Sequence, residues 1–279
     1  VDNELKDTNF NSVITKGTPR FKKSYAGKIF NLAQGGSGNN YFHFIFDLIP
    51  KIYLLKTVLP IESIDFFYVP KITAWQNKIY SLLNIDKKKL IDSNKIRHIQ
   101  GDLIIAVSHP WYFKNDIQTE TKNIPSWVIE YNRIKFLPLM KKFDNHKKIF
   151  LDRSSSIYNH CQIINNNEII DILKKKGFTK YNVEKLDFEE QIYLFNQAST
   201  IIGAHGAAFT NLIFCKPETK VIEIIPTSHS SKKCKRISEI LNLNYHRIET
   251  KDHYKENFPD SILLDKKDIK KIIDTIDPY

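Results

Sequence analysis

Short apolar runs alternate with amphipathic segments throughout the second half of the chain. The apolar runs predict strands at 147–152, 178–183, 199–204, 220–225 and 245–248. The amphipathic segments predict helices at 165–176, 187–198, 207–214, 232–241 and 265–276. Strands that alternate with helices pair in parallel, because each helix carries the chain back across the sheet. The pattern therefore predicts a Rossmann-like α/β fold from about residue 144 onward.

The first part of the chain repeats this alternation less regularly. Its pattern predicts strands at 28–33, 64–69 and within 96–107, and helices at 39–59, 73–83 and 125–143. Pro50 and Pro138 lack a backbone N–H, so each should kink or end its helix. The polar break Asp144–His146 predicts a boundary between an acceptor-side domain, 1–143, and a second domain, 144–279. We expect two α/β lobes that face each other across a cleft, with helix 265–276 free to pack back on the first.

Composition excludes several classes of protein. Apolar residues make up 42% of the 279 residues and charged residues 26%, so the chain can bury a core and is not disordered throughout. The 3 cysteines form no C-x-x-C pair, so neither a disulfide scaffold nor a zinc ribbon is predicted. No apolar run reaches the roughly 18 residues of a spanning helix, and no signal peptide is visible, although the sequence begins at Val1. We expect a cytoplasmic protein, with contact to the inner face of the membrane as a further expectation.

The chain carries a net charge of +11. Residues 1–143 have 21 Lys+Arg and 12 Asp+Glu, a net of +9, and residues 144–279 have 21 and 19, a net of +2. Such an excess suggests an anionic partner: nucleic acid, an acidic membrane surface or an acidic substrate. Solubility and a codon bias toward lysine are the competing explanations. Nucleic acid is disfavoured because the lysine clusters lack interleaved aromatic residues.

Asn40, His43 and Asp47 form one stripe on the predicted helix 39–59. The residues between them are apolar or aromatic, so much of this helix should be buried. A buried carboxylate beside an imidazole is the usual arrangement of a general base. A core hydrogen bond that only joins helix to sheet is the structural alternative, and the sequence leaves both open.

A second candidate site lies where the buried strand 199–204 turns into a helix at His205 and Gly206. The first amides of that helix, from Ala207, have no partners and suit a phosphate. Arg153 follows the strand 147–152 and should emerge at the same sheet edge, where a guanidinium can bind a diphosphate. A tight junction between strand and helix would explain Gly206 but not His205. A surface ion pair would explain Arg153.

Glu223 lies inside the apolar strand 220–225 and needs hydrogen-bond donors, which ribose hydroxyls or backbone amides could supply. The glycines at 35, 36 and 38 do not fit a dinucleotide fingerprint. No Asp-x-Asp and no zinc-ligand spacing is present, so we expect neither a metal nor a cofactor.

Three blocks of residues resemble the family 61 glycosyltransferases across roughly residues 38–226. The blocks are Asn40-Tyr41-Phe42-His43 with Asp47 and Pro50; Leu151-Asp152-Arg153 with Asn165 and Glu168; and Ile202-Gly203-Ala204-His205-Gly206-Ala207 with Gln191, Thr210, Asn211 and Glu223. The third is the most specific. In the second block, Cys161 and Gln162 stand where the family usually has another arginine, and Asn166 stands where it has a glutamate, as in a distant bacterial-type member.

This resemblance implies a GT-B fold and an inverting transferase that uses a nucleotide-sugar, such as a UDP-sugar, and a glycan acceptor, in the synthesis of a surface polysaccharide or a lipopolysaccharide. Asp47 or His43 would be the base. The donor would be held by residues of the second domain: Arg153, His205, Gly206, Ala207, Asn211 and Glu223. Supporting or acceptor-side roles would fall to Asn40, Asn165 and Gln191. A non-catalytic nucleotide- or carbohydrate-binding protein and a basic RNA-binding module remain the alternatives.

Overall fold

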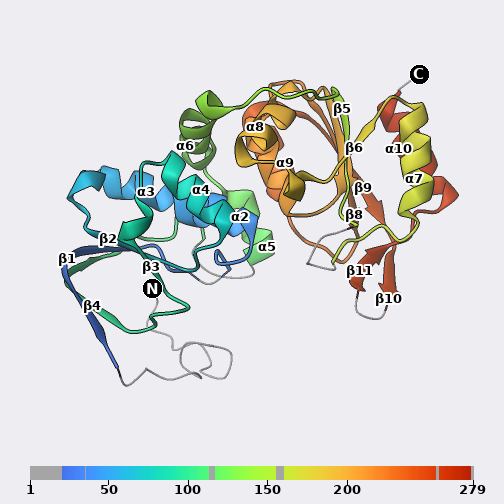
Figure 1. Cartoon of the computed structure of the whole chain (residues 1–279). Coiled ribbons are helices and arrows are strands. Elements are labelled where there is room, and N and C mark those ends of the chain that lie inside the picture. The colour runs from blue at the N-terminus through green and yellow to red at the C-terminus, as the bar shows by residue number, and fades with distance from the viewer. Residues whose placement is uncertain (1–20, 35, 113–116, 155–159, 256–257, 278–279) are drawn as a thin grey trace. The chain divides into compact units, whose positions relative to one another are not determined.

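A computed structural model describes residues 21–34, 36–112, 117–154, 160–255 and 258–277 (Figure 1). The chain forms two compact units, residues 1–113 and 114–279, and each is described by itself. Both are α/β units built on a parallel sheet, as the sequence predicts.

Unit 1 contains a four-stranded parallel sheet of order β3-β2-β1-β4. Its strands are β1 (Lys23–Asn31), β2 (Phe66–Val69), β3 (Leu90–Asp92) and β4 (Ile99–Ile105). Its longer helices are α3 (Ile49–Lys56) and α4 (Ala74–Leu82). The capping box of Thr73 and Gln76 starts α4. The short strand β3 was not predicted, because its three residues carry too little pattern to separate a strand from a loop.

The predicted long helix 39–59 is divided into three parts. A short α-helix, α2 (Tyr41–His43), leads into a π-helical turn, η2 (Phe44–Leu48), and then into α3. In the wide turn the N–H of Ile49 donates to the carbonyl of Phe44. Pro50, the second residue of α3, has no N–H to contribute to a regular helix here. The expected irregularity at Pro50 is therefore a π turn just before it, a feature common at functional sites.

Unit 2 contains a five-stranded, all-parallel sheet of order β6-β5-β7-β8-β9. Its strands are β5 (Lys148–Leu151), β6 (Thr179–Tyr181), β7 (Thr200–Ala204), β8 (Lys220–Pro226) and β9 (Asn244–Thr250). Its main helices are α6 (Ser126–Phe136), α7 (Asn166–Lys175), α8 (Phe188–Gln197), the 3-10 helix η8 (Ala207–Phe214), α9 (Lys233–Leu241) and α10 (Lys266–Ile276). These elements match the predicted alternation closely.

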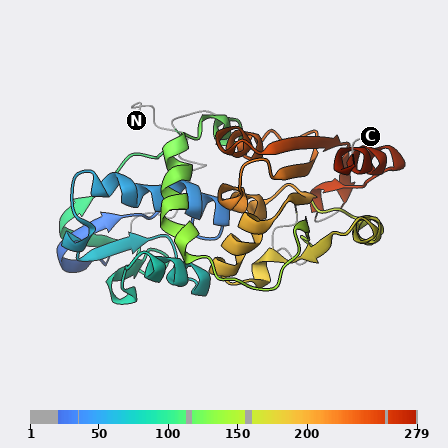
Figure 2. The same cartoon turned by 90° about the horizontal axis from the view of Figure 1, so that it is seen from above.

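Helices cover both faces of this sheet, α7 and α10 on one side and α8 and α9 on the other (Figures 1 and 2). Ile269, Ile272 and Ile276 of α10 belong to the buried core that includes Ile222 of β8 and Leu173 of α7. The last helix thus packs on the sheet of unit 2, because its apolar stripe is buried there, and the expectation that it could pack back on the first domain is not met.

A hairpin of β10 (Asp252–Lys255) and β11 (Phe258–Ile262) follows β9 and was not predicted. Ile262 pairs with Ile163, so the hairpin contacts the chain just before α7. Its sequence is short and polar, without the alternation that would indicate a strand.

The boundary between the units lies at 113/114 rather than at 143/144. Residues 117–143 bond to unit 2: Arg133 of α6 donates to the carbonyl of Cys215 at 2.9 Å, and Arg236 of α9 donates to that of Ile124 at 2.8 Å. The polar break at 144–146 is a surface loop inside unit 2. Within the described ranges, no helix is both long and apolar enough to span a bilayer.

Candidate functional site

Asp47 lies at the carboxyl end of the unit 1 sheet and is fully buried. Its Oδ2 accepts from His43 Nδ1 at 2.7 Å and from Gln34 Nε2 at 3.2 Å, and its Oδ1 accepts from Trp111 Nε1 at 3.0 Å. His109 Nε2 lies 3.5 Å from Oδ2. The carboxylate is thus surrounded by donors and cannot itself reach a substrate.

The pKa of Asp47 reflects these neighbours. Burial alone would raise it, but the imidazoles of His109 and His43 outweigh burial and lower the pKa, so the carboxylate is ionised at neutral pH. Lys51, one turn further along α3, is nearly buried, and burial lowers its pKa while Asp47 raises it.

His43 is positioned by the elements around it. The Asn40 side chain caps α2 by accepting from the N–H of Phe42 at 2.9 Å, which fixes the start of the helix that carries His43. With Nδ1 donating to Asp47, the proton-accepting nitrogen of the neutral ring is Nε2. The His43 side chain is 20% exposed, whereas Asp47 is 0% exposed. Of the two candidate bases, only His43 can touch a substrate.

The second cluster lies at the carboxyl ends of β5 and β7 in unit 2. These two strands pair in parallel, so Arg153 and His205 emerge at one edge, as predicted. The sheet order reverses between β5 and β7, and open α/β sheets bind ligands at such a reversal. A cavity of about 210 Å³ opens there, and Arg153, Ser154, Asn166 and Ala204 are among the residues that line it.

Gly206 makes room for the Arg153 side chain. A Cβ at position 206 would lie 1.3 Å from Arg153 Nη1. The glycine has a φ of 171°, an extended conformation that any residue adopts. Its role is therefore space for the guanidinium rather than the tight junction that the sequence suggested.

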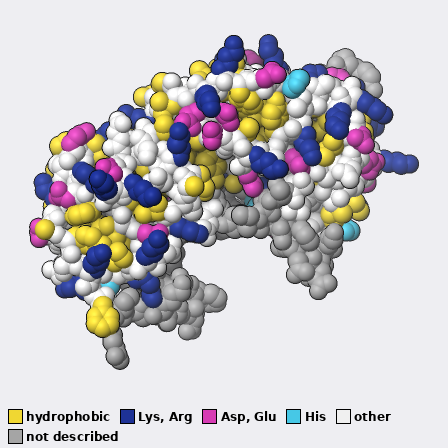
Figure 3. All heavy atoms as spheres, in the orientation of Figure 1, with side chains coloured by type: hydrophobic (Ala, Val, Ile, Leu, Met, Phe, Trp, Pro, Cys, Tyr) yellow, Lys and Arg dark blue, Asp and Glu magenta, His cyan; other side chains and the backbone are white. Residues whose placement is uncertain are grey.

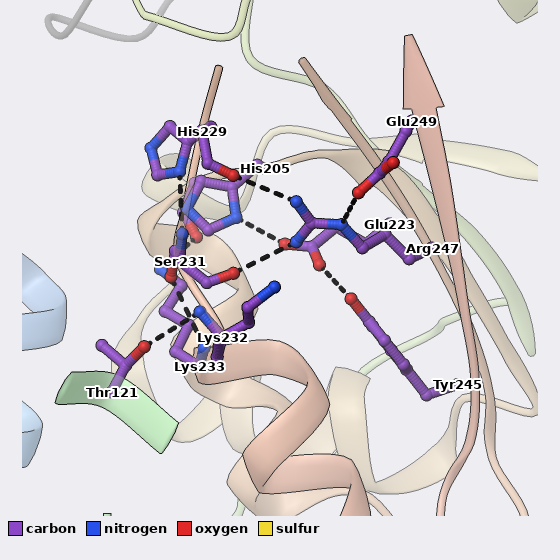
Figure 4. A network of polar contacts seen from close by, with 11 residues as sticks. Thr121, His205, Glu223, His229, Ser231, Lys232, Lys233, Tyr245, Arg247 and Glu249 are labelled. Carbon is purple, nitrogen blue, oxygen red and sulfur yellow. Dashed lines mark hydrogen bonds and ion pairs between the residues drawn. The ribbon is translucent and has the colours of Figure 1, made fainter. Parts of the chain in front are cut away.

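His205 is buried and donates through Nδ1 to Glu223 (Figure 4). Glu223 also accepts from the hydroxyl of Tyr245 on β9. Burial lowers the pKa of His205 to about 3, so the ring is neutral at pH 7. Burial alone would raise the pKa of Glu223, but His205 and Tyr245 lower it. Among the described residues, Glu223 thus accepts from the side chains of His205 and Tyr245.

Further basic groups gather around His205. The ring of His229 lies 4.3 Å from that of His205, and the ring of His160 lies 6.3 Å from that of His229. Buried Lys233 donates through Nζ to the carbonyl of Gly206 at 2.9 Å. Burial lowers the pKa of Lys233 and of Arg153, and it lowers that of His160 to about 4.

The loop after β8, which carries His229, is held by Arg247 of β9. Arg247 donates to the carbonyl of Ser231 at 3.1 Å and to that of His229 at 3.0 Å (Figure 4). The backbone N–H of Lys232 donates to Thr121 Oγ1 at 2.9 Å. These bonds fix the loop beside the His205 turn.

Two groups of side chains have ligand atoms close enough to share a metal ion: His160, Cys161 and His229, and His205, Glu223 and Cys234. Neither fits a cation well. Burial raises the pKa of the Cys161 thiol to about 12 and that of Cys234 well above its usual value, so both hold their protons. Arg153 and Lys233 also act electrostatically on the first group and disfavour a further positive charge. The surroundings suit an anion better.

The remaining predicted residues support the two clusters. Asn211 is fully buried and donates to Gln191 of α8 at 3.0 Å, which fixes η8 against that helix. Asn165 donates to the carbonyl of Leu264 at 2.9 Å and accepts from its N–H at 3.0 Å, so it holds the chain after the hairpin. Ala207 begins η8 directly after Gly206.

Several residues of the clusters were missed in the sequence. No local motif marks them: they are His109, Trp111 and Lys51 in unit 1, and His229, Lys233 and Tyr245 in unit 2. Lys51 continues the stripe of His43 and Asp47 by one more turn, and this spacing could have indicated it. The others reach their clusters only through the pairing of distant strands.

Comparison with known proteins gives the following matches. The model of a family described as Glycosyltransferase 61 matches residues 41–222. A β-1,2-xylosyltransferase of Oryza sativa subsp. japonica is 38% identical over 69 residues, which cover 25% of this chain and 13% of that protein. A β-1,2-xylosyltransferase of Arabidopsis thaliana is 28% identical over 100 residues, 31% of this chain and 19% of that protein. The aligned parts are thus small fractions of both relatives.

Proposed function

The chain belongs to the glycosyltransferase 61 family, and from this premise we propose that it transfers a sugar from a nucleotide-sugar to a hydroxyl group of a glycan, with inversion at the anomeric carbon. The observation that carries the proposal is the pair of His43 and Asp47. Asp47 is buried and ionised, whereas His43 is partly exposed and bonds to Asp47 through Nδ1, which leaves Nε2 for a substrate. This is the arrangement that a general base requires.

The reaction is a single in-line displacement. The acceptor oxygen forms a bond to the anomeric carbon as the bond from that carbon to the diphosphate oxygen breaks. His43 Nε2 takes the proton of the attacking hydroxyl, and Asp47 stabilises the imidazolium that results. The electron pair of the broken bond leaves with the nucleoside diphosphate.

The cluster in unit 2 would hold the leaving diphosphate. Arg153 and the backbone at Gly206 and Ala207 lie at the reversal of the sheet, where a diphosphate would lie next to cationic groups. An incoming anion would also favour the protonated form of Lys233, whose pKa burial lowers. The proposal assigns the proton transfer to unit 1 and the leaving diphosphate to unit 2.

For the donor we propose a UDP-sugar. The two plant relatives are named xylosyltransferases, so a UDP-pentose is the first donor to test, followed by UDP-hexoses.

The charge distribution does not select the acceptor. With the boundary at 113/114, residues 1–113 have 15 Lys+Arg and 9 Asp+Glu, a net of +6, and residues 114–279 have 27 and 22, a net of +5. The excess is therefore shared between the units. Figure 3 shows Lys and Arg side chains spread over the visible face instead of gathered in one patch. The charge distribution therefore gives no support for an anionic acceptor or for a membrane surface beside it.

The test is release of UDP from a panel of UDP-sugars in the presence of glycan acceptors. We expect His43→Ala and Asp47→Asn to reduce kcat by about 10²–10⁴-fold while donor affinity stays within about twofold, because the base acts on the acceptor. We expect Arg153→Ala to weaken UDP binding by roughly 10- to 100-fold. Nucleotide binding without any sugar transfer by the unaltered protein would instead indicate a non-catalytic binding protein.

A further inference from the structure

Two histidines from different parts of unit 1 meet at the carboxylate of Asp47. His43 lies in the segment that follows β1, and His109 lies in the segment that follows β4. These strands are neighbours at the point where the order of the unit 1 sheet reverses. His43 has a role in the proposed reaction, whereas His109 has none assigned.

Of the two ring nitrogens of His109, Nδ1 is hydrogen-bonded, whereas Nε2 has no hydrogen-bond partner within the described residues. Nδ1 accepts from the backbone N–H of Tyr112 at 2.9 Å and lies 3.3 Å from that of Trp111. A nitrogen that accepts is unprotonated, so the proton of the neutral ring is on Nε2. This buried N–H lies 3.5 Å from Asp47 Oδ2, an ion-pair distance, and within the part of the chain that the structure describes it makes no hydrogen bond.

The His109 ring is also fixed by its neighbours. It packs edge to face against Trp111 and Tyr112, with ring centroids 5.2 and 5.7 Å away. Trp111 itself donates to Asp47 Oδ1, so the segment after β4 supplies a group to each carboxylate oxygen. Gln34 and His43 both donate to Oδ2, the oxygen that His109 Nε2 also approaches.

We propose that His109 is a positioning residue for the transfer reaction: through Asp47 it holds His43 in the form protonated at Nδ1, with Nε2 turned to the acceptor. The inference rests on the proposed function. His109 is not the base, because Nδ1 accepts from the Tyr112 N–H and Nε2 carries the proton of the neutral ring; it acts only by fixing the carboxylate that orients the base. The ionisable groups that face Asp47 are His43, His109 and, from α3, Lys51, and Tyr112 flanks His109.

Two variants separate the polar contact of His109 with Asp47 from the packing of its ring. His109→Phe keeps the ring contacts with Trp111 and Tyr112 and removes the N–H. His109→Gln keeps a donor for Asp47 and an acceptor for the Tyr112 N–H. His98→Gln is the matched control, because the same substitution is made just before β4, at the opposite end of the strand.

We expect His109→Phe to reduce kcat by roughly 10- to 100-fold with unchanged donor affinity, less than the loss of the base itself. The acid limb of the kcat/KM profile should move to higher pH, because a carboxylate with one donor fewer binds the protonated His43 more strongly. His109→Gln should restore the limb and most of the rate, and His98→Gln should behave as the unaltered protein. Equal profiles in the Phe variant and the unaltered protein would overturn the inference, as would failure of Gln to restore the limb.

A second measurement does not depend on sugar transfer. Nitrogen NMR of labelled imidazoles reports which nitrogen of His43 carries the proton. We expect Nδ1–H in the unaltered protein and in His109→Gln, and a mixture of both forms in His109→Phe. The NMR measurement also decides if the unaltered protein transfers no sugar or if the Phe variant does not fold. In that case the tautomer of His43 is compared between the unaltered protein and His109→Gln. Retention of Nδ1–H supports the inference, and a mixture of both tautomers contradicts it.

Discussion

Asp47 and Glu223 are both buried carboxylates that accept a hydrogen bond from the Nδ1 of a histidine. Their partners differ in exposure, since the His43 side chain is 20% exposed and that of His205 only 5%. The nearly buried imidazole of His205 can orient the turn that carries it, but only the edge of its ring can contact a substrate. A histidine and a carboxylate therefore suit a general base in unit 1, whereas in unit 2 the same two residue types support the turn next to Arg153.

We expect Gly206→Ala to weaken UDP binding by roughly 10- to 100-fold, because the new Cβ would occupy the position of Arg153 Nη1 and displace a charge-assisted contact. Gly38→Ala is the control, since a Cβ there would meet its nearest atom at 3.7 Å, an ordinary contact. Isothermal titration with UDP measures both. Equal affinity in the two variants would show that the guanidinium does not bind the nucleotide.

At the scale of elements, both sheets bring their candidate residues to a reversal of strand order. In unit 1 the reversal lies between β1 and β4, and in unit 2 between β5 and β7. Loops that leave such neighbouring strands diverge to opposite faces and leave a crevice between them. The helices that cover the sheet of unit 2 bury its apolar faces, and α10 is the last of these helices in the sequence.

We expect Ile272→Ala in α10 to lower the free energy of unfolding by about 2–5 kcal/mol, because Ile272 is fully buried and its loss leaves a cavity. Ile134→Ala removes an isoleucine that is 70% exposed and should change stability by about 0.5 kcal/mol or less. Urea unfolding followed by circular dichroism measures both values. Similar values for the two variants would place α10 outside the core.

At the scale of the whole molecule, unit 2 carries an acid-sensitive core. Burial lowers the pKa of His205 to about 3 and that of His160 to about 4, whereas an unfolded histidine titrates near about 6.5. Between these values the unfolded chain binds protons that the folded chain does not. Stability is therefore complete above about pH 6.5 and declines as the pH falls toward 4, by up to about 1.4 kcal/mol per pH unit for each such histidine.

We expect the urea midpoint to fall between pH 7 and pH 4.5, and to fall less steeply in His160→Gln and His205→Gln, which cannot take up the proton. His253→Gln, at an exposed position, is the control and should show the slope of the unaltered protein. The same slope in all four proteins would mean that these buried histidines do not govern acid stability.

We also expect sugar transfer to persist in EDTA. The groups near Gly206 suit an anion, with Arg153 and Lys233 beside it, so the diphosphate would be neutralised by side chains of the protein. The measurement is UDP release with and without EDTA. Loss of activity that manganese restores would reveal a metal requirement.

Periodicity alone determined most of the secondary structure of unit 2. Runs such as 199–204 and 220–225 are apolar enough to be buried strands, and Asp187 with Glu190 forms the capping box that starts α8. The pairing of His43 with Asp47 also follows from their spacing on one helix. These features depend on residues close in sequence, where local geometry is enough.

Only the tertiary structure decided which residues complete the sites. His109 reaches Asp47 because β4 lies beside β1, and Tyr245 reaches Glu223 because β9 lies beside β8. The same holds for the boundary at 113/114, since Arg133 and Arg236 tie residues 117–143 to unit 2. Such contacts join segments tens of residues apart, and their partners are chosen by the burial of whole faces of a sheet, which no local pattern of residues encodes.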